Sequence, residues 1–83
     1  MSELSKLPNV GKVLEKLLNE VGITTAEELL ELGTEEVFVR IRMKDPTACV
    51  HMLYGIEGAV EGVQDKFLTD ETKEKLKAFY RSL

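Results

Sequence analysis

A short amphipathic segment that follows a tight turn constrains the fold of this chain most strongly. The turn is Leu-Pro-Asn-Val-Gly-Lys at residues 7–12, and Gly22 follows the segment. Between them, apolar residues recur at a spacing that places them on one face of a helix: Val10, Leu14, Leu17, Leu18 and Val21. Because glycine is common just after a helix, the pattern predicts a helix over residues 10–21 that Gly22 ends.

The next segment carries two sets of helix start and stop signals. Thr25 and Glu28 have the spacing of a capping box, in which each side chain pairs with a backbone amide of the other residue. Gly33 is the predicted end of that helix, and Thr34 is the predicted N-cap of another. Pro46 cannot continue a helix, so this second piece is expected to end before it.

Residues 37–43, Val-Phe-Val-Arg-Ile-Arg-Met, fit either a strand or a helix. Valines and alternating arginines are typical of a strand, whereas the cap before them and the basic residues at their end are typical of a helix. A lone strand would find no partner elsewhere in the chain. We therefore expect a helix here.

Two further helices are expected over residues 47–62, with Thr47 as cap, and from Thr69 onward. The last helix has an apolar stripe that we expect to be buried: Leu76, Phe79, Tyr80 and Leu83. In total, the sequence predicts an all-α fold, a compact bundle of about five short helices in a single domain, residues 1–83.

Glycines cluster unexpectedly in the predicted helix over residues 47–62. Gly55, Gly58 and Gly62 create a small-residue surface, although each interior glycine costs about 1 kcal/mol relative to alanine. The simplest compensation is close approach of another helix to this surface.

Composition narrows the function classes. The 83 residues carry a formal net charge of −4, which counts against a strong autonomous DNA binder because phosphate neutralisation supplies most of such a protein's affinity. No apolar run is long enough to cross a membrane, and residues 1–6 have no signal-peptide core, so we expect a cytoplasmic protein without membrane contact. The single cysteine, Cys49, allows no internal disulfide.

The turn at residues 7–12 is the candidate binding site. The first amides of a helix are unpaired and lie at the positive end of its dipole, so they can hold a phosphate. The predicted nucleic-acid or phosphate-binding residues are Asn9, Val10, Gly11, Lys12 and Lys16, and Lys6 could add charge. In the alternative interpretation the turn only redirects the chain, with Asn9 in a left-handed conformation and Gly11 allowing close packing.

Other polar clusters are weaker candidates. Arg40, Arg42 and Lys44 could meet phosphate or an acidic partner, or could simply complement the end of a helix. Five acids without a basic residue among them would repel nucleic acid and could recruit a basic partner, although a solvated face is the simpler interpretation: Glu27, Glu28, Glu31, Glu35 and Glu36.

No set of residues predicts an enzyme, a cofactor or a metal site. Cys49 and His51 are two positions apart and point in different directions on a helix. Glu57 and Glu61 form an i, i+4 carboxylate pair with no histidine ligand nearby. Phosphate-binding loops, dinucleotide-binding fingerprints and nucleophile elbows are absent from the sequence.

Two resemblances sharpen these expectations. Leu7–Lys12 with Val21–Leu29 resembles the helix-hairpin-helix pattern, whose hairpin amides hold DNA phosphate, although Asn9 stands where that family has its first glycine. Nearly the whole chain is more similar to the C-terminal domain of TfoX/Sxy-type regulators of DNA transformation, and Leu53–Ala59 is the more diagnostic block. This resemblance implies a compact helical domain, helix-hairpin-helix-like in its N-terminal half, with a role near transcriptional activation of competence genes.

Two functional hypotheses follow. In the first, the chain is a non-enzymatic regulatory module that binds a transcription-related protein, or DNA phosphate weakly and without sequence preference, with protein contacts slightly favoured because the chain is acidic. In the alternative, it is a structural domain that docks a partner or forms a homodimer and has no nucleic-acid contact. That second role would use the Gly55/Gly58/Gly62 surface or the helix that carries Phe79 and Tyr80.

Overall fold

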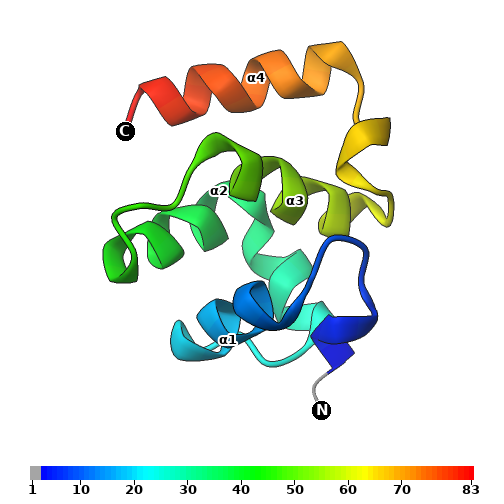
Figure 1. Ribbon diagram of the computed structural model, residues 1–83, viewed down its shortest axis with the longest axis vertical. Helices are drawn as coiled ribbons and strands as arrows, with labels where there is room; N and C mark the ends of the chain where they lie inside the picture. The colour runs from blue at the N-terminus through cyan, green and yellow to red at the C-terminus, as the bar shows by residue number, and fades with distance from the viewer. Residues whose placement is uncertain (1–2) are drawn as a thin grey trace.

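Residues 3–83 are described by a computed structural model, and all regular structure among them is helical. A 3-10 turn, η1 (Glu3–Lys6), precedes helix α1 (Lys12–Glu20). Helices α2 (Ala26–Lys44) and α3 (Val50–Glu61) form the centre, and a second 3-10 turn, η2 (Asp65–Phe67), leads to α4 (Asp70–Arg81). Helix α4 lies along α3 on the side opposite α1 (Figure 1). The all-α prediction is confirmed.

Helix α2 consists of two helical pieces joined at Gly33. That glycine has φ 81° and ψ 163°, a conformation that only glycine adopts without strain. The capping box at Thr25 and Glu28 is present, and the predicted break at Gly33 is a kink. Residues 37–43 lie in the second piece, so the helical alternative is correct.

Three local predictions were wrong in detail. Helix α1 begins at Lys12, because Val10 belongs to the preceding turn and Gly11 is the N-cap. Thr34 is not the cap of the second piece of α2, because the non-helical residue at the kink is Gly33; the Thr34 hydroxyl instead donates to Glu57 Oε1 at 2.6 Å. Cys49 is the N-cap of α3, while Thr47 pairs with Asp45.

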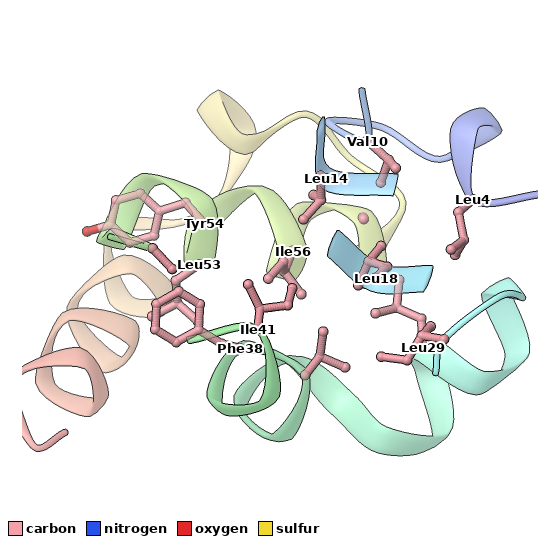
Figure 2. Close-up of a cluster of buried hydrophobic side chains, with 14 of the residues drawn as sticks. Leu4, Val10, Leu14, Leu18, Leu29, Phe38, Ile41, Leu53, Tyr54 and Ile56 are labelled. Carbon is pink, nitrogen blue, oxygen red and sulfur yellow. The ribbon is translucent and has the colours of Figure 1, made fainter. Parts of the chain in front are cut away.

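The core lies between the second piece of α2 and α3, and α1 closes it from one end (Figure 2). Phe38 and Ile41 from α2 meet Leu53 and Ile56 from α3, and all four side chains are essentially inaccessible to solvent. Tyr80 of α4 reaches the same layer, with its ring centroid 6.0 Å from that of Phe38.

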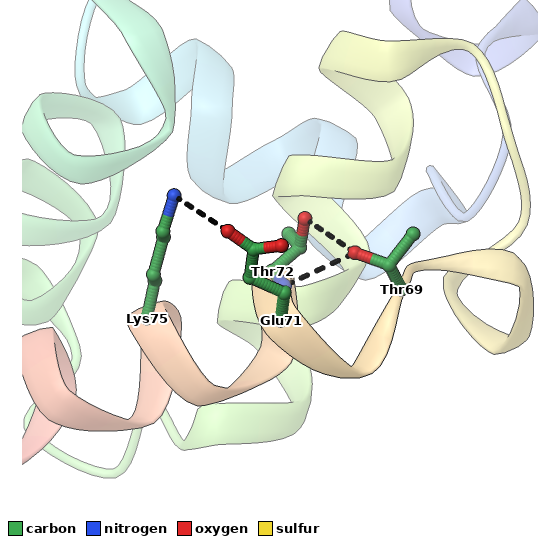
Figure 3. A network of polar contacts seen from close by, with 4 residues as sticks. All are labelled: Thr69, Glu71, Thr72 and Lys75. Carbon is green, nitrogen blue, oxygen red and sulfur yellow. Dashed lines mark hydrogen bonds and ion pairs between the residues drawn. The ribbon is translucent and has the colours of Figure 1, made fainter.

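Side-chain contacts between neighbouring residues stabilise the start of helix α4. The Thr69 hydroxyl accepts a hydrogen bond from the Thr72 amide, and Glu71 pairs with Lys75 one turn later (Figure 3). Leu76 is buried and Phe79 and Tyr80 are half-buried, but Leu83 is 49% exposed. The predicted buried stripe is therefore incomplete at the C-terminal end of the chain.

The glycines of α3 serve a different purpose from the one expected. Gly55 and Gly58 are buried against the loop that contains Asn9, and the other atoms nearest to Gly58 belong to Val63 and Asp65, in the segment after α3, and not to another α-helix. A Cβ added to Gly58 would overlap the Asn9 side-chain amide and would lie 2.7 Å from the Val63 carbonyl oxygen. Gly62 has φ 78° and ends the helix as its left-handed C-cap.

The two buried glycines provide a matched pair of substitutions. We expect Gly58→Ala to lower the free energy of unfolding by about 2 kcal/mol, because overpacking outweighs the gain in helix propensity. At Gly55 a Cβ would meet only the Asn9 Cβ, at an ordinary 3.6 Å, so Gly55→Ala should be neutral or stabilising by up to about 1 kcal/mol. Urea unfolding followed by circular dichroism measures both values, and equal effects at the two positions would contradict this account.

Candidate functional site

The turn before α1 reverses the chain within a few residues. Two backbone hydrogen bonds define it, each between residues three positions apart: the Leu7 amide donates to the Leu4 carbonyl at 3.0 Å, and the Val10 amide donates to the Leu7 carbonyl at 3.3 Å. Asn9 lies inside the second of these turns with φ 68°, the left-handed conformation that asparagine tolerates better than most residues. This geometry points Val10 into the core and leaves Gly11 in the solvent.

The side chain of Asn9 is turned toward α3 and the segment that follows it. Its Nδ2 donates to the Gly55 carbonyl at 3.3 Å and to the Val63 carbonyl at 3.0 Å, and its Oδ1 accepts from the Asp65 amide at 3.1 Å. For this residue the packing interpretation of the turn explains the contacts. The Val10 amide is likewise occupied by the Leu7 carbonyl.

The start of α1 has free amides of the kind that the phosphate hypothesis requires. Gly11, the N-cap, has φ −91° and provides no side-chain cap. Within residues 3–83, no acceptor pairs with the amides of Gly11, Lys12 or Val13. Lys12 and Lys16 are exposed one turn apart on this helix, and Lys6 is exposed at the end of η1. Phosphate binding by these residues stays a prediction.

A shallow hollow of about 530 Å³ lies beside these amides. Lys12 and Val13 line it from α1, and His51 and Met52 line it from α3. The start of α3 also has no side-chain cap, because Cys49 makes no such bond. The positive ends of two helix dipoles therefore border one hollow, and Val13 beside it is 73% exposed.

The basic cluster predicted at the end of α2 is dispersed in the structure. Arg40 pairs with Glu36 at 3.0 Å, an i, i+4 contact. Arg42 lies with its guanidinium 5.1 Å from the centroid of the Tyr80 ring, a cation–π contact between α2 and α4. Only Lys44 remains exposed without a partner in the part of the chain that is described. Arg40 and Arg42 are thus accounted for by an ion pair within α2 and by packing against α4, and a role of the cluster toward phosphate, an acidic partner or the helix end stays a prediction.

The acidic residues divide into two environments. Glu28 accepts hydrogen bonds from the Thr24 amide and hydroxyl and from Thr25, which hold the pKa of Glu28 below its usual range. At the other end of the domain, the neighbouring carboxyl group of Glu57 raises the pKa of Glu61, and desolvation adds to the shift. Within residues 3–83, no three potential metal ligands are grouped together.

A second hollow, which was not predicted from the sequence, lies at the kink of α2. It has a volume of about 650 Å³ and lies between the second piece of α2, the end of α3 and α4. Its lining combines apolar side chains with carboxylates: Leu32, Val39, Val60, Leu76 and Phe79 with Glu35, Glu36 and Glu57. The acidic run in α2 was the only signal of it in the sequence, since the hollow forms where three helices meet.

Residues 1–80 match the TfoX C-terminal domain. The chain belongs to the TfoX C-terminal domain family. It is 31% identical over 80 residues to Protein Sxy of Escherichia coli strain K12, and that match covers 96% of this chain but only 38% of Sxy. The domain thus spans under half the length of this relative.

Solved structures support the same fold. A crystal structure of an uncharacterized protein from Listeria monocytogenes, in a triclinic form, superposes with a TM-score of 0.93 at 46% identity, covering 95% of this chain and 90% of that one. A tetragonal form of a protein of unknown function from the same organism gives 0.91 at 45% identity, covering 94% and 96% of the two chains. Within residues 3–83, no TfoX-domain helix is both long and apolar enough to cross a membrane.

The contribution of the Asn9 side chain can be separated from that of its backbone conformation. Asn9→Gly keeps the positive φ but removes three hydrogen bonds, so it should lower the free energy of unfolding by about 1–2 kcal/mol. Asn9→Ala removes the same hydrogen bonds but requires alanine to adopt the left-handed conformation, so it should be about 1 kcal/mol less stable than Asn9→Gly. Denaturant unfolding of both variants checks this order, and a glycine variant as stable as the parent would show that the hydrogen bonds contribute nothing.

The Glu57–Glu61 pair predicts a pH-dependent effect. Because the folded-state pKa of Glu61 is raised, its ionised form destabilises the fold and protonation relieves that effect. Glu61→Gln should therefore stabilise the protein by roughly 0.2–0.5 kcal/mol at neutral pH and lose that advantage as the pH falls through the pKa of Glu61. Thermal unfolding across this range tests it, with Glu20→Gln on α1 as the charge-matched control.

Proposed function

We propose that this TfoX C-terminal domain is a non-enzymatic regulatory interaction module of cytoplasmic regulators of DNA transformation. Membership in the TfoX C-terminal domain family and the match to Sxy support this role. The chain corresponds to 38% of the length of Sxy, so the activity of a complete regulator is proposed and does not follow from the match. Protein contacts supply most of the binding energy in this role, since the net charge is −4.

The start of α1 contributes a weak contact to a DNA phosphate. The observation that carries this proposal is the group of unpaired, exposed amides at Gly11, Lys12 and Val13, at the positive end of the helix dipole. Lys12 and Lys16 add two charges at the same place, and none of these groups reads a base. The contact is therefore independent of DNA sequence and strongly weakened by salt.

An amide NMR titration with a short DNA duplex tests the contact. At low salt we expect chemical-shift changes at Gly11, Lys12 and Lys16. If two phosphates are neutralised, the logarithm of the affinity should fall with the logarithm of the salt concentration with a slope of about −2. Adjusting the buffer to about 150 mM salt should reverse most of the shifts, because screening and ion competition then dominate.

Two variants with the same charge change provide the control. Lys12→Glu should abolish the shifts, whereas Lys44→Glu, on an exposed cation at the end of α2, should leave them in place. If both variants weaken binding equally, the attraction is only a net-charge effect. Absence of shifts at low salt would remove DNA from the proposal and leave the protein contacts.

A further inference from the structure

Two hollows form a groove along the second piece of α2, a larger one at the kink and a smaller one toward the end of the helix. Glu36, Val39 and Met43 repeat at helical intervals and so share one face of α2. Val39 lines both hollows, and the smaller one, of about 160 Å³, is otherwise lined by Arg42, Met43 and Leu83. On the α4 side, Phe79 and Leu83 border the same groove.

Most of the apolar side chains that border the groove are exposed or half-buried. Met43 is 82% exposed and Leu83 is 49% exposed, while Leu32, Val39, Val60 and Phe79 are half-buried in its walls. The stretch from Thr34 to Met43 rises by roughly 15 Å, which is about the length of three turns of an opposing helix.

Carboxylates surround the deep end of the groove, at the kink. Each charged residue that lines it there is a glutamate: Glu35, Glu36 and Glu57. Glu36 is paired with Arg40, but Glu35 is exposed with no ion pair in the described chain. Glu57 accepts a hydrogen bond from the Thr34 hydroxyl, and its carboxyl group is close enough to raise the pKa of Glu61. A cation placed here would reduce the repulsion between these carboxylates.

We infer that this groove binds an amphipathic helix of a protein partner, with apolar residues along one face and lysine or arginine at the end that meets the α2 kink. The apolar walls match the i, i+3, i+4, i+7 anchors of such a helix, and the carboxylates match its basic residues. A nucleic acid would be repelled by the same glutamates. The inference rests on the proposed role as an interaction module, but it uses none of the residues of the α1 phosphate contact.

A designed peptide is the probe. It is a capped helix of about 12 residues, with leucines on one face and lysines at the remaining positions of one end. One control peptide replaces the lysines with glutamates, and another has the same composition but scrambled, so that no face is apolar. Binding is followed by amide NMR of the whole domain, with shifts expected at the groove: residues 33–36, 39, 57, 60 and 79.

Charge-matched variants separate specific docking from general attraction. Glu35→Lys should lower the affinity of the domain for the leucine–lysine peptide by about five- to tenfold, because an attractive contact becomes repulsive. Glu27→Lys, an equal change on the first turn of α2 outside the groove, should change its affinity by less than about twofold. Both side chains are exposed, so neither substitution should disturb the fold.

Each result decides the inference. Groove shifts that are lost with both control peptides and weakened selectively by Glu35→Lys support it. Equal weakening by the two variants, equal binding of the glutamate peptide, or no groove shifts at millimolar peptide would overturn it. The shifts of Gly11 and Lys12 on adding DNA are a separate readout, so failure of the groove inference and failure of the phosphate contact are distinguishable.

Discussion

The arrangement of the two halves of this domain depends on a single side-chain amide, that of Asn9. Its hydrogen bonds join the turn before α1 to Gly55, Val63 and Asp65, which are 46 to 56 positions away in sequence. The bonds are exposed or partly exposed and together contribute only about 1–2 kcal/mol, but they hold the turn against α3. Because the same residue adopts a left-handed conformation, the chain then enters α1 with Val10 in the core and the next amides directed outward. The geometry of the candidate phosphate contact is thus a consequence of the packing of Asn9.

Local signals were sufficient to predict most of the secondary structure. The capping box at Thr25, the cap at Thr69 and the break at Gly33 each depend on residues within one turn of the chain, and each is present. The helix over residues 37–43 could be chosen over a strand because an isolated strand has no partner. By contrast, the hydroxyl of Thr34 donates a hydrogen bond to Glu57, 23 positions away, and no local rule predicts this contact.

The reason for the α3 glycines could not be predicted either, because it also lies in a contact with a residue that is distant in sequence. The sequence shows that Gly58 must accommodate a close neighbour, but a helix and a side chain from a distant turn produce the same requirement. Similarly, Arg40 and Arg42 look like one cluster in the sequence, although an acid one turn away pairs with the first and an aromatic ring from α4 takes the second. The missing side-chain cap of α1 was predictable, because Gly11 has no side chain to supply one.

The two proposed contacts complement each other because they have opposite charge and lie on different parts of the domain. Exposed amides and lysines at the start of α1 attract an anion, whereas glutamates at the α2 kink attract a cation and repel nucleic acid. In an acidic domain, the first contact alone is weak at physiological salt. If a basic partner occupies the groove, its charge offsets part of the net −4 and its own contacts hold the domain near DNA, so that the α1 contact acts at a high effective concentration. An acidic module can in this way assist DNA binding that it could not achieve alone.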